Sequence, residues 1–348
     1  MRIAILSPVW FPVPPSGYGG IEWVVSLLAD GLVDAGHDVC LFASGDSTSK
    51  AEVVSLFPDA PSADIGKTST ELRHALSCFE RAAEFDIVND HSGPLAAALG
   101  GAIETPVVHT VHGPLVGRDG ELYASLARVA PGVGLISVAM NQRKPQPDLP
   151  WVANCHNALD LAAYPAHTER GEYLLFLGRM SADKGCHRAV EVAREAGLPL
   201  RIAGKMREPA EQEYFESYVA PYLGNGIEYL GETSHAKKVA LLQNARATLF
   251  PIEWEEPFGL VMIESMACGT PVIATRWGAV PEVIEHGRSG IIVDDYRKMA
   301  DALADADELE PSECRRSVEE RFSAERMVRD YEAAYAAAVE GTRAPTPV

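Results

Sequence analysis

The sequence lacks paired cysteines and long apolar runs, and each absence excludes a class of protein. Six cysteines are spread through 348 residues without a Cys-x-x-Cys pair or a His/Cys cluster, so no metal-ligand motif is present. This cysteine usage favours a reducing cytoplasm. No apolar stretch reaches the roughly 20 residues that a membrane-spanning helix needs. Residues 1–8 are too short for a signal peptide and carry no cleavage signal, so they are expected to form a first strand.

Basic residues are also scarce relative to acidic ones. The 30 Lys and Arg residues against 49 Asp and Glu residues give a formal net charge of -19. Recognition of a nucleic-acid polymer needs a basic face, so we expect no nucleic-acid partner. The same balance argues, less strongly, against docking on anionic lipid. We therefore expect a cytoplasmic protein without a stable membrane anchor.

The length and the hydrophobic content suit two domains. The chain is 47% hydrophobic and 23% charged, which is enough for two separate cores. Short branched apolar runs alternate with helical patterns in both halves, which predicts an α/β fold with parallel sheets covered by helices on both faces. The expected strands are residues 2–6, 39–43, 86–88, 106–111 and 135–138, then 173–177, 200–203, 227–230, 248–250, 272–274 and 291–293.

The domain boundaries are predicted from composition. The Pro-rich segment 144–150 breaks helix and sheet, so the joint is expected within it or shortly after it. We predict an N-terminal domain of residues 1–160 and a C-terminal domain of residues 161–322, both Rossmann-like. Residues 323–348 are expected to form a C-terminal helix followed by a flexible tail from 342 to 348.

The most informative segment runs from Glu256 to Glu264 and reads Glu-Pro-Phe-Gly-Leu-Val-Met-Ile-Glu. It predicts a loop followed by a helix, whose free N–H groups around Phe258, Gly259 and Leu260 would favour an anion such as phosphate. The two carboxylates suit a ligand that also carries hydroxyl groups. One of them could hold a sugar and the other, about two turns further along, a ribose. In the alternative, Glu256 only complements the helix dipole and Glu264 is a solvated surface residue.

A second phosphate-binding candidate follows the expected strand 173–177. The loop Gly-Arg-Met-Ser-Ala-Asp-Lys-Gly, residues 178–185, leads into an amphipathic helix. Arg179 can bind two oxygens at once, and Lys184 supplies a point charge. The alternative is that both cations are solvated loop residues.

The first strand is followed by a Gly-rich turn and a helix. Gly19 and Gly20 allow the backbone to approach a ligand closely, and the helix start favours an anion. A dinucleotide-binding fingerprint would need Gly or Ala where Glu22 stands. Two Rossmann-like halves and this turn suggest a nicotinamide-dependent oxidoreductase. The dinucleotide-binding motif that such an enzyme needs is, however, incomplete in this sequence.

Three histidines lie at expected strand ends, where ligands bind in open α/β sheets. In a strand His109 and His112 point to opposite faces, so at most one faces a cleft, and we favour His112 beside Gly113. His91 could line the acceptor side, although a structural role is the favoured interpretation for it.

Together these motifs resemble the retaining glycosyltransferases of family 4, which have the GT-B fold. The segment from Glu256 through 265–274 is similar to the donor-site signature of that family, and Gly178-Arg179 with Lys184-Gly185 is similar to its phosphate-binding pair. The resemblance covers nearly the whole chain, tightly from 173 to 295. One departure is Ala158, where the family usually has Gly. Further matching segments are Gly19-Gly20, Thr110-Val111-His112, Gly278-x-x-Pro281-Glu282 and Gly287-x-x-Gly290.

The resemblance implies two Rossmann-like β/α/β domains with parallel sheets that face each other across a cleft. The donor would bind the C-terminal domain and the acceptor the N-terminal domain, onto which the last helix would cross back. Arg179 and Lys184 would neutralise the donor diphosphate, Glu264 would hold the ribose hydroxyls, and Glu256 would contact the transferred sugar.

The remaining implied roles fall on both domains. His112 would touch the transferred sugar, and Gly19 and Gly20 would approach the phosphate. The backbone of Phe258, Gly259 and Leu260 would complete the phosphate cradle. His112, Arg179, Lys184 and Glu256 are thus the candidate catalytic residues, and His91 is a weak candidate on the acceptor side.

The implied activity is transfer of a sugar from a nucleotide diphosphate sugar to a hydroxyl group, with retention, in carbohydrate or natural-product biosynthesis. We expect no cofactor and no metal, because Arg179 and Lys184 can stabilise the leaving phosphate and no convincing Asp-x-Asp site is visible. A UDP-, GDP- or ADP-sugar would be the donor. The helical segment 21–35 carries acidic residues but no Lys or Arg, which favours a small soluble or saccharide acceptor over anionic lipid.

Other classes of function remain open. A nucleotide-sugar epimerase with the same fold would convert the donor without an acceptor, and an NAD-dependent oxidoreductase is less favoured. A binding protein that has lost turnover is disfavoured because Arg179, Lys184, Glu256 and Glu264 are all present. The donor base, the sugar, the acceptor and the oligomeric state are not determined by these motifs.

Overall fold

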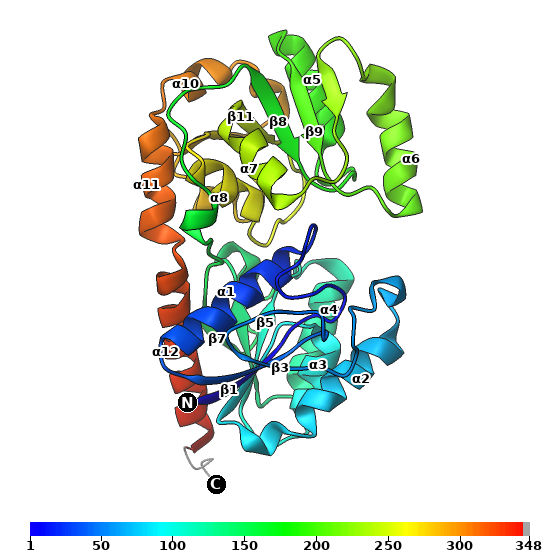
Figure 1. The fold of residues 1–348 in the computed structure, drawn as a ribbon, viewed down its shortest axis with the longest axis vertical. Helices are drawn as coiled ribbons and strands as arrows, with labels where there is room; N and C mark the ends of the chain where they lie inside the picture. The colour runs from blue at the N-terminus through cyan, green and yellow to red at the C-terminus, as the bar shows by residue number, and fades with distance from the viewer. Residues whose placement is uncertain (344–348) are drawn as a thin grey trace. The chain divides into compact units, whose positions relative to one another are not determined.

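The computed structural model describes residues 1–343. The chain forms two compact units, one made of Met1–Ala158 together with the chain from Ala324 onward, and one made of Leu159–Ser323 (Figure 1). Of the tail predicted to be flexible, residues 344–348 lie outside the described residues.

The first unit is built on a parallel sheet of seven strands in the order β3-β2-β1-β4-β5-β6-β7. The ladders are in register along buried strands, for example Ile3 opposite Val39 and Ile87, so hydrophobic side chains meet on both faces. The strands are β1 (Arg2–Leu6), β2 (Asp38–Phe42), β3 (Glu52–Val54), β4 (Ile87–Asp90), β5 (Val107–Val111), β6 (Val133–Ser137) and β7 (Trp151–Asn154).

Helices cover both faces of this sheet (Figure 1). On one face lie α1 (Gly20–Asp34) and α12 (Ala324–Arg343), which pack on each other, and α12 also packs on β7. The other face carries α2 (Thr68–Phe79), α3 (Pro94–Gly100) and α4 (Gly117–Val129), whose apolar residues form one core with the sheet. Short 3-10 turns are η1 (Ser62–Asp64), η2 (Ala82–Glu84) and η3 (Asn141–Arg143).

The second unit contains a parallel sheet of six strands in the order β10-β9-β8-β11-β12-β13. The order places β8 and β11 side by side at the centre, so their carboxyl ends bring two loops together. The strands are β8 (Tyr173–Leu177), β9 (Leu200–Ala203), β10 (Ile227–Tyr229), β11 (Ala245–Phe250), β12 (Val272–Thr275) and β13 (Gly290–Val293).

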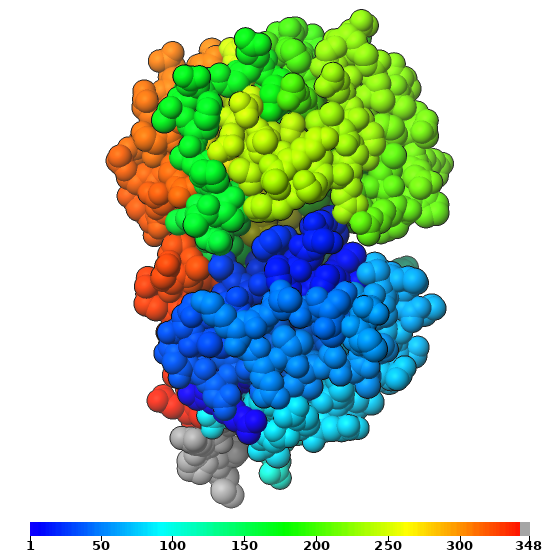
Figure 2. All heavy atoms as spheres, in the orientation of Figure 1, coloured from blue at the N-terminus to red at the C-terminus, as the bar shows by residue number. Residues whose placement is uncertain are grey.

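Helices also flank the second sheet. The helices α5 (Cys186–Ala196), α6 (Pro209–Tyr218) and α10 (Leu303–Asp307) share a core with the sheet. The helix α8 (Leu260–Ala267) packs against α7 (His235–Gln243) and α11 (Pro311–Arg321). Residues of α6 and α7 form part of the surface of this unit in Figure 2. The shorter elements are α9 (Val280–Val283), η4 (Leu161–Ala163), η5 (Ala220–Tyr222) and η6 (Tyr296–Lys298).

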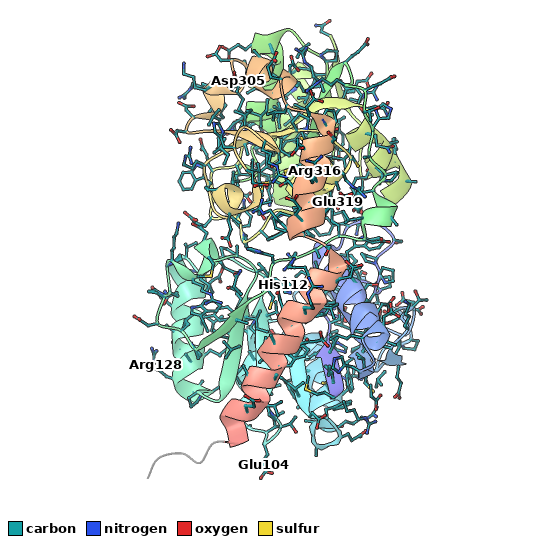
Figure 3. All side chains as sticks on the ribbon, turned by 90° about the vertical axis from the view of Figure 1, so that its left-hand side faces the viewer. Glu104, His112, Arg128, Asp305, Arg316 and Glu319 are labelled. Atoms are coloured by element: carbon teal, nitrogen blue, oxygen red, sulfur yellow. The ribbon has the colours of Figure 1, made fainter. Side chains whose placement is uncertain are left out.

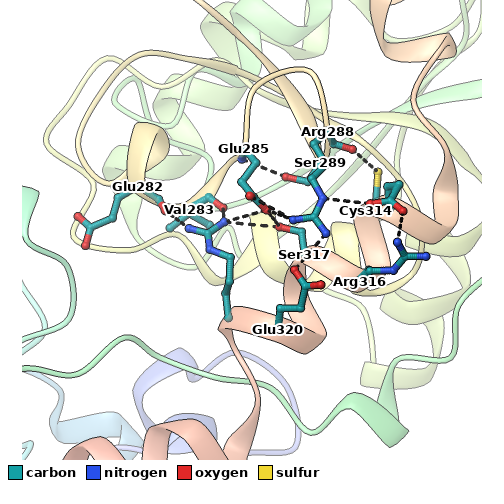
Figure 4. A network of polar contacts seen from close by, with 11 residues as sticks. Glu282, Val283, Glu285, Arg288, Ser289, Cys314, Arg316, Ser317 and Glu320 are labelled. Atoms are coloured by element: carbon teal, nitrogen blue, oxygen red, sulfur yellow. Dashed lines mark hydrogen bonds and ion pairs between the residues drawn. The ribbon is translucent and has the colours of Figure 1, made fainter.

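A charged network fastens the loop before β13 to α11 (Figure 4). The guanidinium of Arg288 lies 3.0 Å from carboxylate oxygens of Glu285, Glu313 and Glu320. The hydroxyl of Ser317 donates to Glu285 over 2.5 Å. These contacts fix the Gly287-x-x-Gly290 segment to the outer helix. Arg288, Glu285 and Glu313 are half-buried and Glu320 is exposed, so salt would partly screen these ion pairs and each contributes little to stability.

The predicted α/β class with two parallel sheets is confirmed, and every expected strand is present with shifts of a few residues. Two strands, β3 and β7, were not predicted. Both are short edge strands with partly exposed side chains, so they lack the continuous apolar pattern of a central strand. Because β7 follows the Pro-rich segment 144–150, that segment lies inside the first unit and the chain leaves it after Ala158.

Candidate active site

The second unit gathers several candidate residues at the carboxyl edge of its sheet. Lys184 comes from the loop after β8, and Glu256 comes from the loop after β11. Lys184 Nζ forms an ion pair with Glu256 Oε2, and the two side chains are only 16% and 9% exposed. Lys184 is therefore a paired, largely buried cation, and the alternative that it is a solvated loop residue is wrong.

Trp254 contacts both members of this ion pair, although no role was predicted for it. Its indole Nε1–H donates to Glu256 Oε2 over 3.1 Å. The ammonium of Lys184 lies 4.5 Å from the centre of the Trp254 ring, within the range of a cation–π contact. The indole thus helps to fix the positions of both the Glu256 carboxylate and the Lys184 ammonium group.

Arg179 lies in the same loop as Lys184 and is about one-third exposed. Its Nη2 lies 3.5 Å from Asp183 Oδ2, an ion pair within the loop. A guanidinium has five N–H donors in a planar fork, so this single contact leaves capacity for further oxygen atoms. Arg179 is consequently placed where an anion could reach it from solvent.

Arg188 joins the two loops but was missed in the sequence. It is buried in the first turn of α5, donates to the carbonyl of Pro251 over 2.9 Å and pairs with Glu253 at 2.5 Å. The available signal was an arginine among the apolar residues of an amphipathic helix, which needs buried partners. Its contacts hold the loop after β8 against the loop after β11.

The helix α8 begins at Leu260, with Gly259 as its N-cap residue in the left-handed conformation at φ 82°. The first N–H groups of any helix have no carbonyl acceptor within the helix, so this end can bind an anion. The Phe258 side chain is buried and packs edge-on against Phe322. Phe258 therefore anchors the loop through its ring.

Gly278 allows the loop after β12 to touch the backbone of Glu256. A Cβ atom at this position would lie 2.3 Å from the Glu256 nitrogen and 2.4 Å from its carbonyl oxygen, closer than atoms can pack. The N–H of Ala279 donates to that carbonyl over 2.9 Å. The glycine of the Gly-x-x-Pro-Glu segment thus determines where Glu256 sits.

Glu264 is buried inside the second unit rather than solvated, so the alternative of a surface residue is wrong. Its Oε1 accepts from the hydroxyl of Tyr164 over 2.7 Å and from Lys238 Nζ over 2.5 Å. Burial and the adjacent Glu264 charge raise the pKa of Tyr164, which keeps the phenol protonated as a donor. Tyr164 and Lys238 were not predicted, because neither lies in a recognisable motif.

In the first unit His91 directly follows β4 and His112 directly follows β5, whereas His109 lies within β5. His109 is buried, and its two ring nitrogens lie 2.6 Å from Asp90 Oδ2 and 2.8 Å from the Tyr123 hydroxyl. His112 is half-buried, and its Nε2 lies 2.9 Å from Nδ1 of the buried His91. His112 is thus the more accessible of the three, and His91 supports it from the interior.

The Gly-rich turn of the first unit leads into α1 at Gly20, with Gly19 as the N-cap residue at φ 149°. A Cβ atom on Gly19 would lie 2.8 Å from atoms of the Pro15 ring and 2.9 Å from Glu22 Oε2. Glu22 is buried in the first turn of α1, and burial raises the pKa of its carboxyl to about 7. The turn therefore holds an acid that is largely protonated below neutral pH.

Metal-binding clusters and membrane-spanning helices are both absent from residues 1–343. No group of three or more His, Cys, Asp or Glu side chains in this range is placed to hold a metal ion. The Asp-x-Asp sequence at 305–307 lies on α10, where Asp307 pairs with Arg246 at 2.5 Å. Within the same range no helix is both long and apolar enough to cross a membrane. The six cysteines are buried free thiols.

The fold and the site define a class of two-unit, Rossmann-like α/β proteins. Residues 18–196 match the family model described as Glycosyltransferase Family 4, and residues 161–321 match the model described as Glycosyl transferases group 1. The first of these matches spans half of the chain, and the protein belongs to glycosyltransferase family 4. The resemblance seen in the sequence is thereby confirmed, and so is the GT-B fold.

Individual relatives agree with this family. The glycogen synthase of Mycobacterium tuberculosis is 26% identical over 345 residues, covering 84% of this chain and 82% of that protein. AviGT4, a glycosyltransferase involved in avilamycin A biosynthesis, superposes with a TM-score of 0.71 at 25% identity and 98% coverage of both chains. Anabaena HepE, solved with UDP-glucose, shares the fold with a TM-score of 0.74 at 17% identity, over 97% of this chain and 99% of that chain.

Proposed function

We propose that this protein transfers a sugar from a nucleotide diphosphate sugar to a hydroxyl group of an acceptor, with retention of anomeric configuration and without a metal ion. The proposal rests on a set of charged groups, in which Lys184 pairs with Glu256 in the loop before α8 and Arg179 lies in the same loop as Lys184. It combines two cations and helix N–H groups, which suit a diphosphate, with a carboxylate, which suits sugar hydroxyls. The crystal structure of HepE with UDP-glucose supports a donor of this kind.

The donor diphosphate would bind Arg179, Lys184 and the backbone from Phe258 to Leu260. Lys184 is paired with Glu256 in this structure, so donor binding would exchange one anionic partner for another. Cations and amide groups that are already fixed in place stabilise charge on a leaving phosphate at little reorganisation cost. In this way the second unit can serve as the donor side.

The two glutamates would bind different parts of the donor. Oε1 of Glu264 accepts from Tyr164 and Lys238, and its other oxygen would accept from a ribose hydroxyl. Glu256, once released from Lys184, would accept from a hydroxyl of the transferred sugar. The nucleotide base is left open, so UDP-, GDP- and ADP-sugars are all candidate donors.

The first unit would provide the acceptor side. His112 would contact the transferred sugar, Gly19 and Gly20 would approach the phosphate, and His91 would act through His112. In the transfer step an acceptor oxygen forms the new bond to the anomeric carbon. The bond from that carbon to the diphosphate breaks with its electron pair on oxygen, and the leaving phosphate takes the acceptor proton.

We favour a soluble or saccharide acceptor. The helix α1 carries Asp30 and Asp34 but neither Lys nor Arg, and Lys50, which neighbours it, is held by Asp34 at 2.6 Å. A surface of this charge does not suit anionic lipid. The glycogen synthase relative and AviGT4 support a role in carbohydrate or natural-product biosynthesis.

A donor screen followed by turnover tests the proposal. A donor that binds the folded protein raises its melting temperature by an amount set by RT ln(1 + [L]/Kd), so UDP-, GDP- and ADP-sugars can be ranked by thermal shift. The best donor is then incubated with saccharide acceptors, with and without EDTA, and the product linkage is assigned by NMR. Retained configuration and unchanged turnover in EDTA are expected. Conversion of the donor without acceptor, or stabilisation by NADH alone, would contradict the proposal.

A further inference from the structure

A series of hydrogen bonds runs from Asn89 through His91 to the ring of His112. The donor and acceptor atoms of this series can be assigned from Asn89, which is buried on β4. The Asn89 Nδ2 atom lies 3.4 Å from the carbonyl of Val108 and 3.1 Å from Thr110 Oγ1. A carbonyl can only accept, so this side of the amide must be the NH₂ group. The opposite atom, Oδ1, is therefore an acceptor.

Two donors point at Asn89 Oδ1. The hydroxyl of Tyr335 on α12 donates to it over 2.7 Å, and His91 Nε2 lies 2.8 Å from it. Because an amide oxygen cannot donate, His91 Nε2 must carry the proton. In a neutral imidazole the other nitrogen, Nδ1, is then an acceptor.

The same reasoning passes to the next ring. His91 Nδ1 lies 2.9 Å from His112 Nε2, so an accepting Nδ1 requires a proton on His112 Nε2. The remaining ring atom of a neutral His112, its Nδ1, then carries a lone pair. Burial lowers the pKa of His91 well below its usual value and that of His112 to about 3, which keeps both rings neutral.

The backbone beside His112 is held separately. The side-chain Nε2 of Gln142 donates to the carbonyls of Val111 and Gly113, each over 2.8 Å, on either side of His112. Gln142 Oε1 accepts from the N–H of Val138 over 2.9 Å, which fixes the orientation of the amide. Gln142 therefore grips the chain on both sides of His112, whose position is labelled in Figure 3.

We propose that Asn89, His91 and Gln142 are positioning residues that hold His112 as the neutral Nε2–H tautomer, with Nδ1 ready to accept a hydrogen bond from a ligand hydroxyl. The role of His112 Nδ1 as acceptor of a hydrogen bond from a ligand hydroxyl rests on the proposed function, whereas the tautomer follows from the hydrogen bonds alone. The C-terminal helix takes part, because Tyr335 fixes Asn89 and Tyr331 lies 3.3 Å from Thr110 Oγ1. His112, on the proposed acceptor side, is thus orientated by residues that include members of β4, η3 and α12.

The first test measures the tautomer directly. Protein labelled with ¹⁵N-histidine is studied by long-range ¹H–¹⁵N NMR at neutral pH, with signals assigned from His91→Asn and His112→Gln. The expected spectrum shows both His91 and His112 as neutral Nε2–H rings. A wild-type His112 that is protonated on Nδ1 would overturn the proposal, whether or not the protein transfers sugars.

The second test compares two substitutions of similar size. Asn at position 91 can place an amide oxygen near the original Nδ1, whereas Leu cannot accept a hydrogen bond. His91→Leu is expected to convert His112 to a mixture of tautomers and to lower kcat/KM for the best donor about tenfold. His91→Asn should keep the Nε2–H tautomer and stay within about threefold of wild type. Equal loss in both variants with an unchanged His112 spectrum would show that position 91 acts only on packing and would contradict the proposal.

Discussion

At the scale of single residues, charged side chains that are proposed to bind the sugar donor form ion pairs with residues of opposite charge. Lys184 is paired with Glu256, and Glu264 is paired with Lys238. A largely buried charge without a partner would cost several kcal/mol, so these pairs let the site be built before a donor arrives. They also mean that the site can be tested by breaking each pair separately.

Lys184→Ala and Arg179→Ala should each lower kcat/KM for the best donor by about 10²- to 10³-fold, because each removes a cation from the leaving phosphate. Lys298→Ala provides the control, since Lys298 is a highly exposed lysine of the same unit. Steady-state kinetics and thermal melting are measured on all three variants. Turnover in both site variants equal to that of Lys298→Ala would remove them from the site.

Glu264→Ala should weaken nucleotide binding by about 10- to 100-fold, because it removes the proposed acceptor for the ribose hydroxyls. Tyr164→Phe keeps the carboxylate and removes one donor to it, so its effect should be smaller. Isothermal titration calorimetry with the nucleoside diphosphate distinguishes the two. Wild-type affinity in Glu264→Ala would rule out this role.

The buried Glu22 predicts a pH effect on stability. Burial raises its pKa to about 7 from 4.5, so the folded protein holds the proton more tightly than the unfolded chain does. The stabilisation is complete below about pH 4.5 and is lost as the pH rises to about 7, by up to roughly 3 kcal/mol. Glu22→Gln should therefore gain in melting temperature relative to wild type between pH 5 and pH 8. The exposed Glu325→Gln should show no such gain, and a parallel pH profile for Glu22→Gln would disprove the effect.

At the scale of the elements, loops after neighbouring parallel strands form the candidate site of the second unit. The loops after β8 and β11 meet because those strands pair, and Arg188 fastens them together. The loop after β12 joins them through Gly278, which packs on the backbone of Glu256. The site is thus supported by backbone contacts as well as by side chains.

Gly278→Ala should disturb this arrangement more than a glycine substitution elsewhere. Its φ of 54° is unfavourable for alanine, and the new methyl group would overlap the Glu256 backbone. Gly197→Ala is the matched control, since Gly197 also has a positive φ of 67° but faces open space. We expect about 1 kcal/mol of destabilisation for Gly197→Ala and at least about 2 kcal/mol for Gly278→Ala, with loss of turnover only in the latter. Similar melting temperatures for the two variants would refute the close-approach argument.

At the scale of the whole molecule, the chain leaves the first unit after Ala158 and returns to it at Ala324. The returning helix α12 buries Tyr331 and Tyr335 completely within the first unit. The second unit has its own core, formed by its central strands with α5, α6 and α10. The first unit therefore needs two separate segments of the chain in order to fold, whereas the second unit is one continuous segment.

A fragment of residues 159–323 should consequently fold alone and melt cooperatively, because its core is complete. A fragment of residues 1–158 should aggregate or melt without a clear transition, because it lacks the helix that covers α1 and β7. Adding residues 324–343 through a flexible linker should restore folding. Circular dichroism and differential scanning calorimetry provide the comparison, and cooperative melting of the 1–158 fragment alone would contradict the role of α12.

The sequence alone determined most of the element types, their order and the main motifs. Strand, loop and helix signals are local, because hydrophobic period, glycine and charged residues act within a few turns of the chain. Arg179, Lys184, Glu256 and Glu264 could therefore be identified as candidates from the short segments that contain them. The edge strands β3 and β7 escaped because partly exposed short strands have a weak pattern.

Only the tertiary structure decided which groups meet. Lys184 and Glu256 are separated by 72 residues, Tyr164 and Glu264 by 100, and Asn89 and Tyr335 by 246. Such contacts depend on strand order and on where α12 returns, and neither leaves a periodic signal in the chain. The tautomer of His112 belongs to this second category, because it is set by donors and acceptors that folding brings together.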